Sequence, residues 1–323
     1  MTPRWSWDFE DEPPSGRAPR PLAPPAVPVS HEVDLAQIRR RRGSAAVILL
    51  LVVVLLVSAL VGGSHHAHAK TPTTTATAGA TKQHATQAPK VEESTAAGQA
   101  AVRSVFSYTP FVKAGGTRGH DVALTFDDGP GPYTPQVLDV LERFHVRATF
   151  FEIGKMLRYF SASTVREVAD GDVIGDHTES HPAMAELSAH DQHEELFEQI
   201  ARVEVLGAPR PDLFRPPYGS FDTTTMHVLY TMHLLMVLWS IDTQDYLQPG
   251  VGTIVKRALE GVGPGSIILM HDGGGDRAQT IAALPTIIRG LRARGLRLVT
   301  VPQLLIDDPP PAGQPLPPNL SGD

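Results

Sequence analysis

The chain contains no cysteine among its 323 residues. It therefore has no disulfide bond, no thiol nucleophile and no thiolate ligand, so any bound metal must use histidine and carboxylate ligands. An excess of basic residues is also absent, because 28 Lys and Arg stand against 35 Asp and Glu, for a formal net charge of -7. This balance argues against a general nucleic-acid binder.

The N-terminal third does not have the composition of a folded domain. Residues 1–43 are rich in proline and predict a disordered segment. Residues 44–63 predict a transmembrane helix, because the run from Ala45 to Val61 carries no charge and spans roughly 25 Å at about 1.5 Å per residue. Residues 64–105, rich in Thr, Ala, His and Gln, predict a flexible stalk.

The charges that flank residues 44–63 predict how the chain is oriented. Arginines occupy positions 39–42, whereas the following flank has no Lys or Arg through His68. The positive-inside rule therefore predicts a single-pass protein of the cell membrane, with the N-terminus in the cytoplasm and the large domain outside. A cleavable signal is the alternative, because Ala67-His68-Ala69 resembles a cleavage site and cleavage near Ala69 would give a secreted protein. Both interpretations place the large domain across the membrane.

Beyond residue 120, apolar runs of strand length alternate with helical patterns. The predicted strands lie near residues 122–126, 147–153, 172–176, 212–215, 235–241, 265–270 and 297–301. The predicted helices lie near residues 134–144, 162–170, 186–206, 222–232, 251–261 and 278–294. About seven β-then-α units in about 185 residues predict an α/β fold with parallel strands, better suited to a (β/α) barrel than to an open sheet. We assign residues 106–306 to this domain and residues 307–323 to a loose proline-rich tail.

Two adjacent carboxylates, Asp127 and Asp128, follow the apolar strand pattern and precede Gly129-Pro130. The carboxyl ends of strands are where α/β folds place their chemistry. Adjacent residues there can point in different directions, so one carboxylate can bind a metal while its neighbour handles a proton. The same residues also suit a simple turn.

Four further strand patterns end in ionisable residues. His177 and His181 are four residues apart and can converge on one ion if the segment curls into a turn of helix. Arg215 precedes two prolines that stiffen the loop, and its guanidinium can hold a carboxylate. Asp242 and His271 end the last two patterns. Five strand ends that terminate in Asp, His or Arg are hard to ascribe to chance.

These five segments resemble, in order, the five motifs of the polysaccharide deacetylases, carbohydrate esterase family 4 with its NodB homology domain. The matching segments are Thr125 to Pro130, His177 to His181, Arg215 to Gly219, Asp242-x-x-Asp245-Tyr246 and Leu269-x-His271. The resemblance covers about residues 118–305 and does not extend to the N-terminal third.

The resemblance implies a distorted (β/α) barrel with a divalent metal, usually zinc and alternatively cobalt, manganese or nickel, on Asp128, His177 and His181. It implies that Asp127 is the general base positioned by Arg215, and that His271 is the general acid tuned by Asp242. The remaining implied roles are an oxyanion contact from the backbone N–H of Tyr218 and substrate contacts from Leu269, Tyr246 and Pro217. The family usually has Trp where this chain has Tyr246, so the pocket wall is expected to be smaller or more polar.

The expected activity is metal-dependent removal of acetyl groups from N-acetylglucosamine or N-acetylmuramic acid in a cell-wall polymer, peptidoglycan or chitooligosaccharide. An O-deacetylating esterase of the acetylxylan type is an alternative that the motifs do not separate. A catalytically dead wall-binding module would have lost a ligand or the base, and all of them are retained here. His190 and His193 could form a second metal site, but a solvated helix face is the preferred interpretation.

Overall fold

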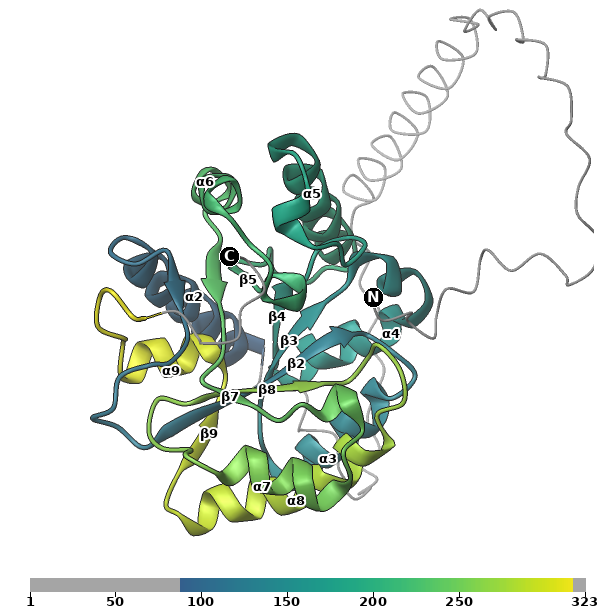
Figure 1. Ribbon diagram of the computed structural model, residues 1–323, viewed down its shortest axis with the longest axis vertical. Coiled ribbons are helices and arrows are strands. Elements are labelled where there is room, and N and C mark those ends of the chain that lie inside the picture. The colour runs from purple at the N-terminus through teal and green to yellow at the C-terminus, as the bar shows by residue number, and fades with distance from the viewer. Residues whose placement is uncertain (1–87, 316–323) are drawn as a thin grey trace, which may run out of the picture. The chain divides into compact units, whose positions relative to one another are not determined.

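The computed structural model describes residues 88–315 (Figure 1). The predicted disordered segment 1–43, the predicted transmembrane helix 44–63 and the first part of the predicted stalk lie outside these residues. Within residues 88–315 we find no helix with both the length and the apolar character needed to span a bilayer.

A curled sheet of nine strands forms the centre of the described part of the chain. Its strands run in the order β1-β6-β5-β4-β3-β2-β8-β7, all registered pairs are parallel, and β9 also pairs with β2. Their bounds are β1 (Phe111–Val112), β2 (Asp121–Gly129), β3 (Thr149–Glu152), β4 (Val173–Asp176), β5 (Leu213–Phe214), β6 (Leu235–Val237), β7 (Ile241–Asp242), β8 (Ile267–His271) and β9 (Arg297–Val299). No pairing within residues 88–315 joins β1 to β7, so the sheet forms part of a barrel and does not close. The expectation of a parallel α/β sheet with barrel curvature is confirmed.

Helices surround this sheet and follow the strands along the chain (Figure 1). Their bounds are α2 (Ala88–Phe106), α3 (Thr134–Phe144), α4 (Gly154–Asp170), α5 (Ala189–Val205), α6 (Thr223–Met232), α7 (Val251–Leu259), α8 (Ala278–Ala293) and α9 (Val301–Asp307), with short 3₁₀ turns η1 (Met184–Glu186), η2 (Pro217–Gly219) and η3 (Asp245–Leu247). The predicted helix near 162–170 is longer in the structure, where α4 begins at Gly154. The prediction missed its first half because the helical periodicity is interrupted at Phe160, which has a non-helical backbone. Helices α2 and α9 and strand β1 were not predicted.

Strand β2 holds the core together because it contacts β3, β8 and β9 and is buried along its whole length. Alternate side chains point to opposite faces of a strand. Leu124 and Phe126 pack toward the layer of α3, α7 and α8, where Phe126 stacks on Phe150 with ring centroids 5.2 Å apart. Ala123 packs into a second cluster with Val102 of α2 and Leu304 of α9. The end of β2 therefore has a rigid support.

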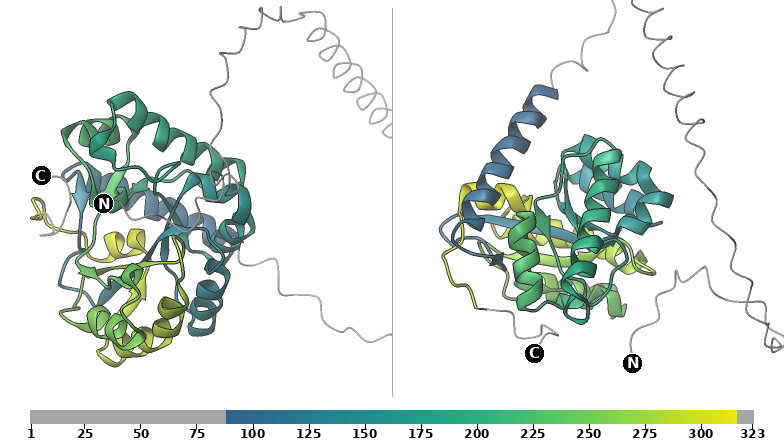
Figure 2. Two further views of the ribbon diagram at one scale, coloured as in Figure 1. Left: turned by 45° about the vertical axis from the view of Figure 1, so that its right-hand side comes forward. Right: turned by 90° about the horizontal axis from the view of Figure 1, so that it is seen from above.

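Two predicted boundaries of the domain differ from the structure. Residues 88–105 were assigned to the stalk, but they form nearly all of α2, which lies beside α9 (Figure 2). Val102 and Val105 are buried there, a spacing of three residues that places both on one helix face. The tail is also held beyond residue 306, because the Asp308 carboxylate accepts from the N–H of Arg118 at 2.6 Å and Gln314 bonds to Ala114 at 2.7 Å.

Candidate active site

The polar motifs meet at one rim because the strands that carry them are parallel neighbours. Asp127 on β2 pairs in register with His271 on β8. On the other side of β2, the sheet continues through β3 and β4 to β5, and Arg215 follows β5 directly. Residues that follow these strands therefore converge at the carboxyl edge of the sheet.

Asp128, His177 and His181 form a group able to hold a metal ion, with their ligand atoms within 4.8 Å of one another. The Nε2 atoms of His181 and His177 lie 3.0 and 3.4 Å from Oδ1 of Asp128. Oδ2 of Asp128 is buried without a hydrogen-bond partner among the described residues, so this oxygen is available as a metal ligand. Nδ1 of His177 lies 2.7 Å from the carbonyl oxygen of Arg215, which can only accept, so Nδ1 carries the hydrogen and Nε2 faces the cluster as a ligand. Two imidazoles and one carboxylate suit a catalytic zinc site that keeps an open position.

The protonation states of this group also suit a metal. Burial alone would raise the pKa of Asp128, but the imidazoles of His181 and His177 hold it well below its usual range. Burial lowers the pKa of His181. The carboxylate is thus ionised and the imidazole neutral near pH 7, which are the forms that bind metal ions.

The two histidines converge in a different way from the expected turn of helix. Residues 177–181 form a bent loop in which Thr178 and His181 have left-handed backbones, with φ of 69° and 63°. The loop is fixed by hydrogen bonds from the N–H of His181 to the hydroxyl of Thr178 at 2.8 Å and from the N–H of Thr178 to Asp176 at 2.7 Å. Within residues 88–315, His190 and His193 belong to no group of three possible ligands, so the second metal site has no support there.

Arg215 holds Asp127 beside the three possible metal ligands. Its Nη1 donates to Oδ1 of Asp127 at 2.7 Å and lies 2.8 Å from the hydroxyl of Thr125. Its Nε and Nη2 donate to the carbonyls of Val237 and Leu238. The guanidinium is fully buried and lies 4.1 Å from the centre of the Phe151 ring. Oδ1 of Asp127 is thereby fixed, and Oδ2 lies 3.9 Å from Nε2 of His177.

Asp245, not the predicted Asp242, contacts His271. Nδ1 of His271 lies 2.8 Å from Oδ1 of Asp245, and the backbone N–H of His271 donates to Oδ2 at 2.9 Å. The hydroxyl of Thr280 donates to the same Oδ2 at 2.7 Å. Asp242 instead accepts from the N–H of Gln244 at 2.8 Å. Gln244 has a left-handed backbone with φ of 50°, which turns the chain so that Asp245 is buried.

The Asp245 carboxylate changes the acidity of His271. Burial by itself lowers the pKa of His271, but the charge of Asp245 and its hydrogen bond, with the charges of Asp128 and Asp127, raise it to about 9. Burial likewise opposes ionisation of Asp245, yet His271 and Thr280 hold the pKa of that carboxyl below its usual range. The imidazole therefore carries a proton that it can donate.

The residues expected to contact substrate surround this group. The Tyr218 ring lies 4.6 Å from that of His181, and the Tyr246 ring lies edge-on to His271 at 5.3 Å. Both tyrosines are about two-fifths exposed, so they border the site on two sides. Leu269 precedes His271 by two residues on β8 and shares its face, whereas Pro217 is buried in η2. The oxyanion role of Tyr218 and the substrate roles of Leu269, Tyr246 and Pro217 stay predictions.

Buried carboxyl groups that the sequence analysis did not assign lie behind the site. Asp272 follows His271, Glu152 ends β3, and Glu167 lies on α4. Burial raises the pKa of Glu152 to about 7 and that of Asp272 to about 8. The one available signal was position, because Glu152 and Asp272 also stand at the ends of strand patterns.

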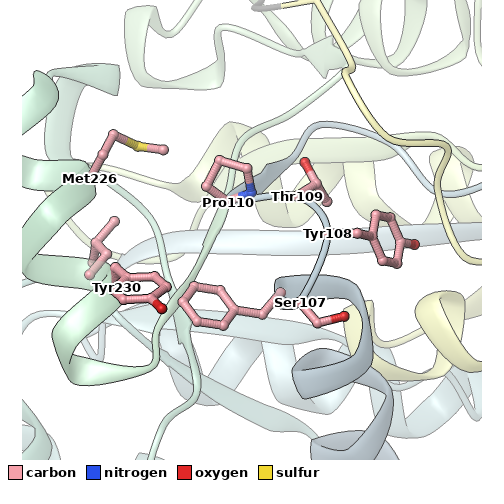
Figure 3. Close-up of a pocket in the computed structure, with 8 residues that line it drawn as sticks. Ser107, Tyr108, Thr109, Pro110, Met226 and Tyr230 are labelled. Carbon is pink, nitrogen blue, oxygen red and sulfur yellow. The ribbon is translucent and has the colours of Figure 1, made fainter.

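A hollow of about 390 Å³ lies away from these strand ends, between the end of α2 and α6. Tyr108 and Tyr230 lie on opposite sides of it (Figure 3). Its lining has no charged side chain and none of the motif residues, so it offers no acid, base or metal ligand.

Comparison with known proteins agrees with this geometry. Residues 114–237 match the family model described as polysaccharide deacetylase. A chitooligosaccharide deacetylase of Sinorhizobium fredii is 36% identical over 209 residues, which cover 61% of this chain and 97% of that protein. A crystal structure of a peptidoglycan N-acetylglucosamine deacetylase superposes with a TM-score of 0.59 at 34% identity, covering 62% of this chain and 94% of the other.

A peptidoglycan-N-acetylglucosamine deacetylase of Bacillus cereus is 38% identical over 187 residues, which cover 57% of this chain and 87% of that protein. Similarity at this level over most of a relative's length, together with motifs that meet at one rim, leads to one conclusion. This chain belongs to the polysaccharide deacetylase family.

Proposed function

We propose that this protein is a metal-dependent hydrolase that removes acetyl groups from N-acetylated amino sugars of a cell-wall polysaccharide. The observation that carries the proposal is that the ligand group Asp128, His177 and His181 lies at the same rim as a candidate proton acceptor and a candidate proton donor. Oδ2 of Asp127 lies 3.9 Å from Nε2 of His177, and Asp127 pairs in register with His271, which Asp245 keeps protonated. Hydrolysis of an amide needs both, because water must lose a proton and the amine must gain one.

When bound by these three ligands, a divalent cation, zinc by the chemistry of this donor set, would polarise the acetamide carbonyl and lower the pKa of a water. Asp127 accepts the proton of the attacking water through the oxygen that Arg215 does not hold. Arg215 keeps this carboxylate in one orientation.

His271 completes the reaction. As the bond between the carbonyl carbon and the sugar nitrogen breaks, His271 donates its Nε2 proton to that nitrogen, so that acetate and a free amine leave. Asp245 fixes the ring through Nδ1, which leaves Nε2 as the proton donor. The backbone N–H of Tyr218 is proposed to bind the carbonyl oxygen as negative charge develops on it.

The substrate is proposed from the relatives and from the expected compartment. The similar proteins are deacetylases of peptidoglycan N-acetylglucosamine and of chitooligosaccharides. The N-terminal sequence would direct the domain to the outer face of the cell membrane. Peptidoglycan is the abundant acetylated polymer there. O-deacetylation of a glycan such as acetylxylan is the second candidate, because the same base and metal ligands serve an ester.

Acetate release tests both candidates. The purified full-length chain, loaded with zinc, is incubated in parallel with peptidoglycan, chitooligosaccharides and acetylxylan. We expect acetate from peptidoglycan or chitooligosaccharide, loss of activity with a chelator, and recovery with zinc or another divalent ion. Release from acetylxylan alone would favour the esterase, and full activity in a metal-free preparation would contradict the mechanism.

The proposed location is the outer face of the cell membrane. Protease added to intact cells or spheroplasts should digest the C-terminal domain and leave the arginine-flanked N-terminal segment protected. A C-terminal domain that survives in intact cells would exclude this topology.

A further inference from the structure

Asp272 is fully buried and directly follows His271 at the carboxyl end of β8. Its backbone N–H donates to the carbonyl of Asp127 at 3.1 Å, which ties the ends of β8 and β2 together. Its carboxylate contacts a different element, the first residue of α3, where it accepts a hydrogen bond from the hydroxyl of Thr134. The mechanism above has no use for this carboxyl group.

Thr134 links Asp272 to the turn that follows the two catalytic-site aspartates. The same hydroxyl accepts a hydrogen bond from the backbone N–H of Gly131 at 2.7 Å, so it bridges the turn and the carboxylate. The turn packs closely on this bridge, because a Cβ added to Gly129 would overlap the carboxylate of Asp272. A Cβ on Gly131 would lie 3.2 Å from the Cα of Gly273. Gly129 therefore permits the close approach of this carboxylate, and a side chain at position 131 would pack tightly against Gly273.

The geometry of Asp128 makes this support necessary. Asp128 has a left-handed backbone with φ of 70°, a conformation that is strained for a residue other than glycine. Such a conformation persists only where the surrounding structure fixes it. The turn at 129–131 is the next segment of chain, and the bridge holds it through the N–H of Gly131.

We propose that Thr134 and Asp272 are positioning residues, which act through the turn at 129–131 to fix the directions in which Asp127 and Asp128 present their carboxylates. Asp128 then meets His177 and His181 in ligand geometry, and Asp127 faces the water. The activity readouts rest on the proposed function, whereas metal affinity is measured independently of it.

Asparagine is a close substitute for Asp272. Oδ1 of Asp272 is buried without a hydrogen-bond partner in the described part of the chain, and no cation bonds to the side chain there. Burial, assisted by the charges of Glu152, Asp128 and Asp127 and opposed by the hydrogen bond from Thr134, raises its pKa to about 8. The neutral amide of Asn keeps an oxygen that can accept from Thr134, so Asp272→Asn preserves the bridge, whereas Asp272→Ala removes it.

The test compares variants of the full-length chain that remove or keep the bridge. Thr134→Val and Asp272→Ala remove it, Thr134→Ser and Asp272→Asn keep it, and a double variant joins the two removals. Thr300→Val is the matched control, because Thr300 is also a threonine at a helix start, the N-cap of α9. Its hydroxyl likewise accepts a backbone N–H, that of Gln303 at 3.3 Å, away from Asp128, His177 and His181. Zinc affinity is measured by competition with a chromophoric chelator, and kcat and KM are measured by acetate release.

Loss of a group that orients metal ligands typically lowers metal affinity or activity by about 10- to 100-fold, and for this more remote bridge we expect about 10-fold. The loss should fall on zinc affinity and kcat, with KM little changed. Thr134→Ser and Asp272→Asn should restore both. The double variant should lose no more than either single variant, because both remove the same bridge.

A purely structural role predicts a different pattern. If Thr134→Val and Thr300→Val lose similar thermal stability and both keep full zinc affinity, the positioning role is overturned. Additive losses of zinc affinity in the double variant would show that Thr134 and Asp272 act separately, and would overturn the proposal that they act through one bridge. Should Thr134→Val not fold, Asp272→Ala against Asp272→Asn decides by the same measurement. A chain that releases no acetate would refute the proposed function but leave the zinc comparison intact.

Discussion

Replacement of Asp245 by asparagine should change the acidity of His271 more than any other single substitution near the site. The amide keeps the shape of the carboxyl group and can still accept from the hydroxyl of Thr280, but it carries no charge. The matched control is Asp242→Asn, which removes a carboxylate three residues away that bonds to Gln244 and not to His271.

The expected magnitude follows from the pKa of His271. A rise from the ordinary value of 6.5 to about 9 corresponds to about 3 kcal/mol of extra stabilisation of the imidazolium. Asp245 supplies the two largest of the interactions that oppose burial, so in Asp245→Asn the pKa of His271 should fall toward or below its ordinary value. Because the folded-state pKa is the higher one, this stabilisation is fully present below pH 6.5 and is lost as the pH rises through about 9.

Two measurements on the metal-free chain check this expectation. NMR titration of ¹⁵N-labelled histidine should show the pKa of one buried imidazole falling in Asp245→Asn and staying high in Asp242→Asn. The difference in free energy of unfolding between the chain and Asp245→Asn should be largest below pH 6.5 and shrink as the pH rises through about 9. On the zinc-loaded enzyme, kcat on an N-acetyl sugar should fall by about 10²- to 10⁴-fold. An unchanged titration in Asp245→Asn, or an equal effect of Asp242→Asn, would refute the assignment of Asp245 as the partner of His271.

The remaining predictions concern the metal ligands, the acid and the base. His177→Ala should lose bound zinc because two protein ligands hold the ion too weakly against water, whereas the control His193→Ala should keep it. Metal analysis after dialysis measures the zinc content of both variants. Zinc retained in His177→Ala would exclude this ligand set. His271→Ala should retain much more kcat/KM on an activated aryl acetate than on an N-acetyl sugar, because a phenolate leaves without protonation, and equal losses on the two substrates would remove the general-acid role. Asp127→Asn should bind zinc but lose about 10²- to 10⁴-fold activity on both substrates, since it removes the proton acceptor for water. Arg215→Lys should lower kcat while zinc stays bound, because an ammonium cannot reproduce bonds to Asp127 and two backbone carbonyls at once; normal kcat would show that the fork of Arg215 is not needed.

Much of the domain follows from sequence patterns because its strands are short apolar runs that end in polar residues. The strand that carries Asp127 and Asp128 was predicted within three residues at either end, since burial on both faces leaves a nearly continuous apolar pattern. Helix α2 was missed because its composition, with Thr, Glu and Gln between small residues, is typical of a linker. Its stability comes from packing on α9, which sequence reasoning could not see.

Several features of the site could not be predicted from local sequence patterns. Asp242 and Asp245 belong to one motif, and the spacing alone does not say which carboxyl turns inward. The left-handed backbone of Gln244 decides it, and glutamine gives no sequence signal for that conformation. The same holds for the loop between His177 and His181, where a turn of helix was expected. Asp272 was missed because its partner, Thr134, is 138 residues away.

The left-handed backbones at Asp128, His181 and Tyr218 have a consequence for engineering. With φ of 70°, 63° and 59°, each of these residues holds a conformation that glycine adopts without strain, worth roughly 1 kcal/mol per position. Glycine at any of them would relieve backbone strain. It would also remove a metal-ligating side chain, at Asp128 or His181, or a ring that borders the site, at Tyr218. A variant library selected for melting temperature alone would therefore accumulate inactive proteins at these positions, so thermostability selections on this scaffold need turnover as a second criterion.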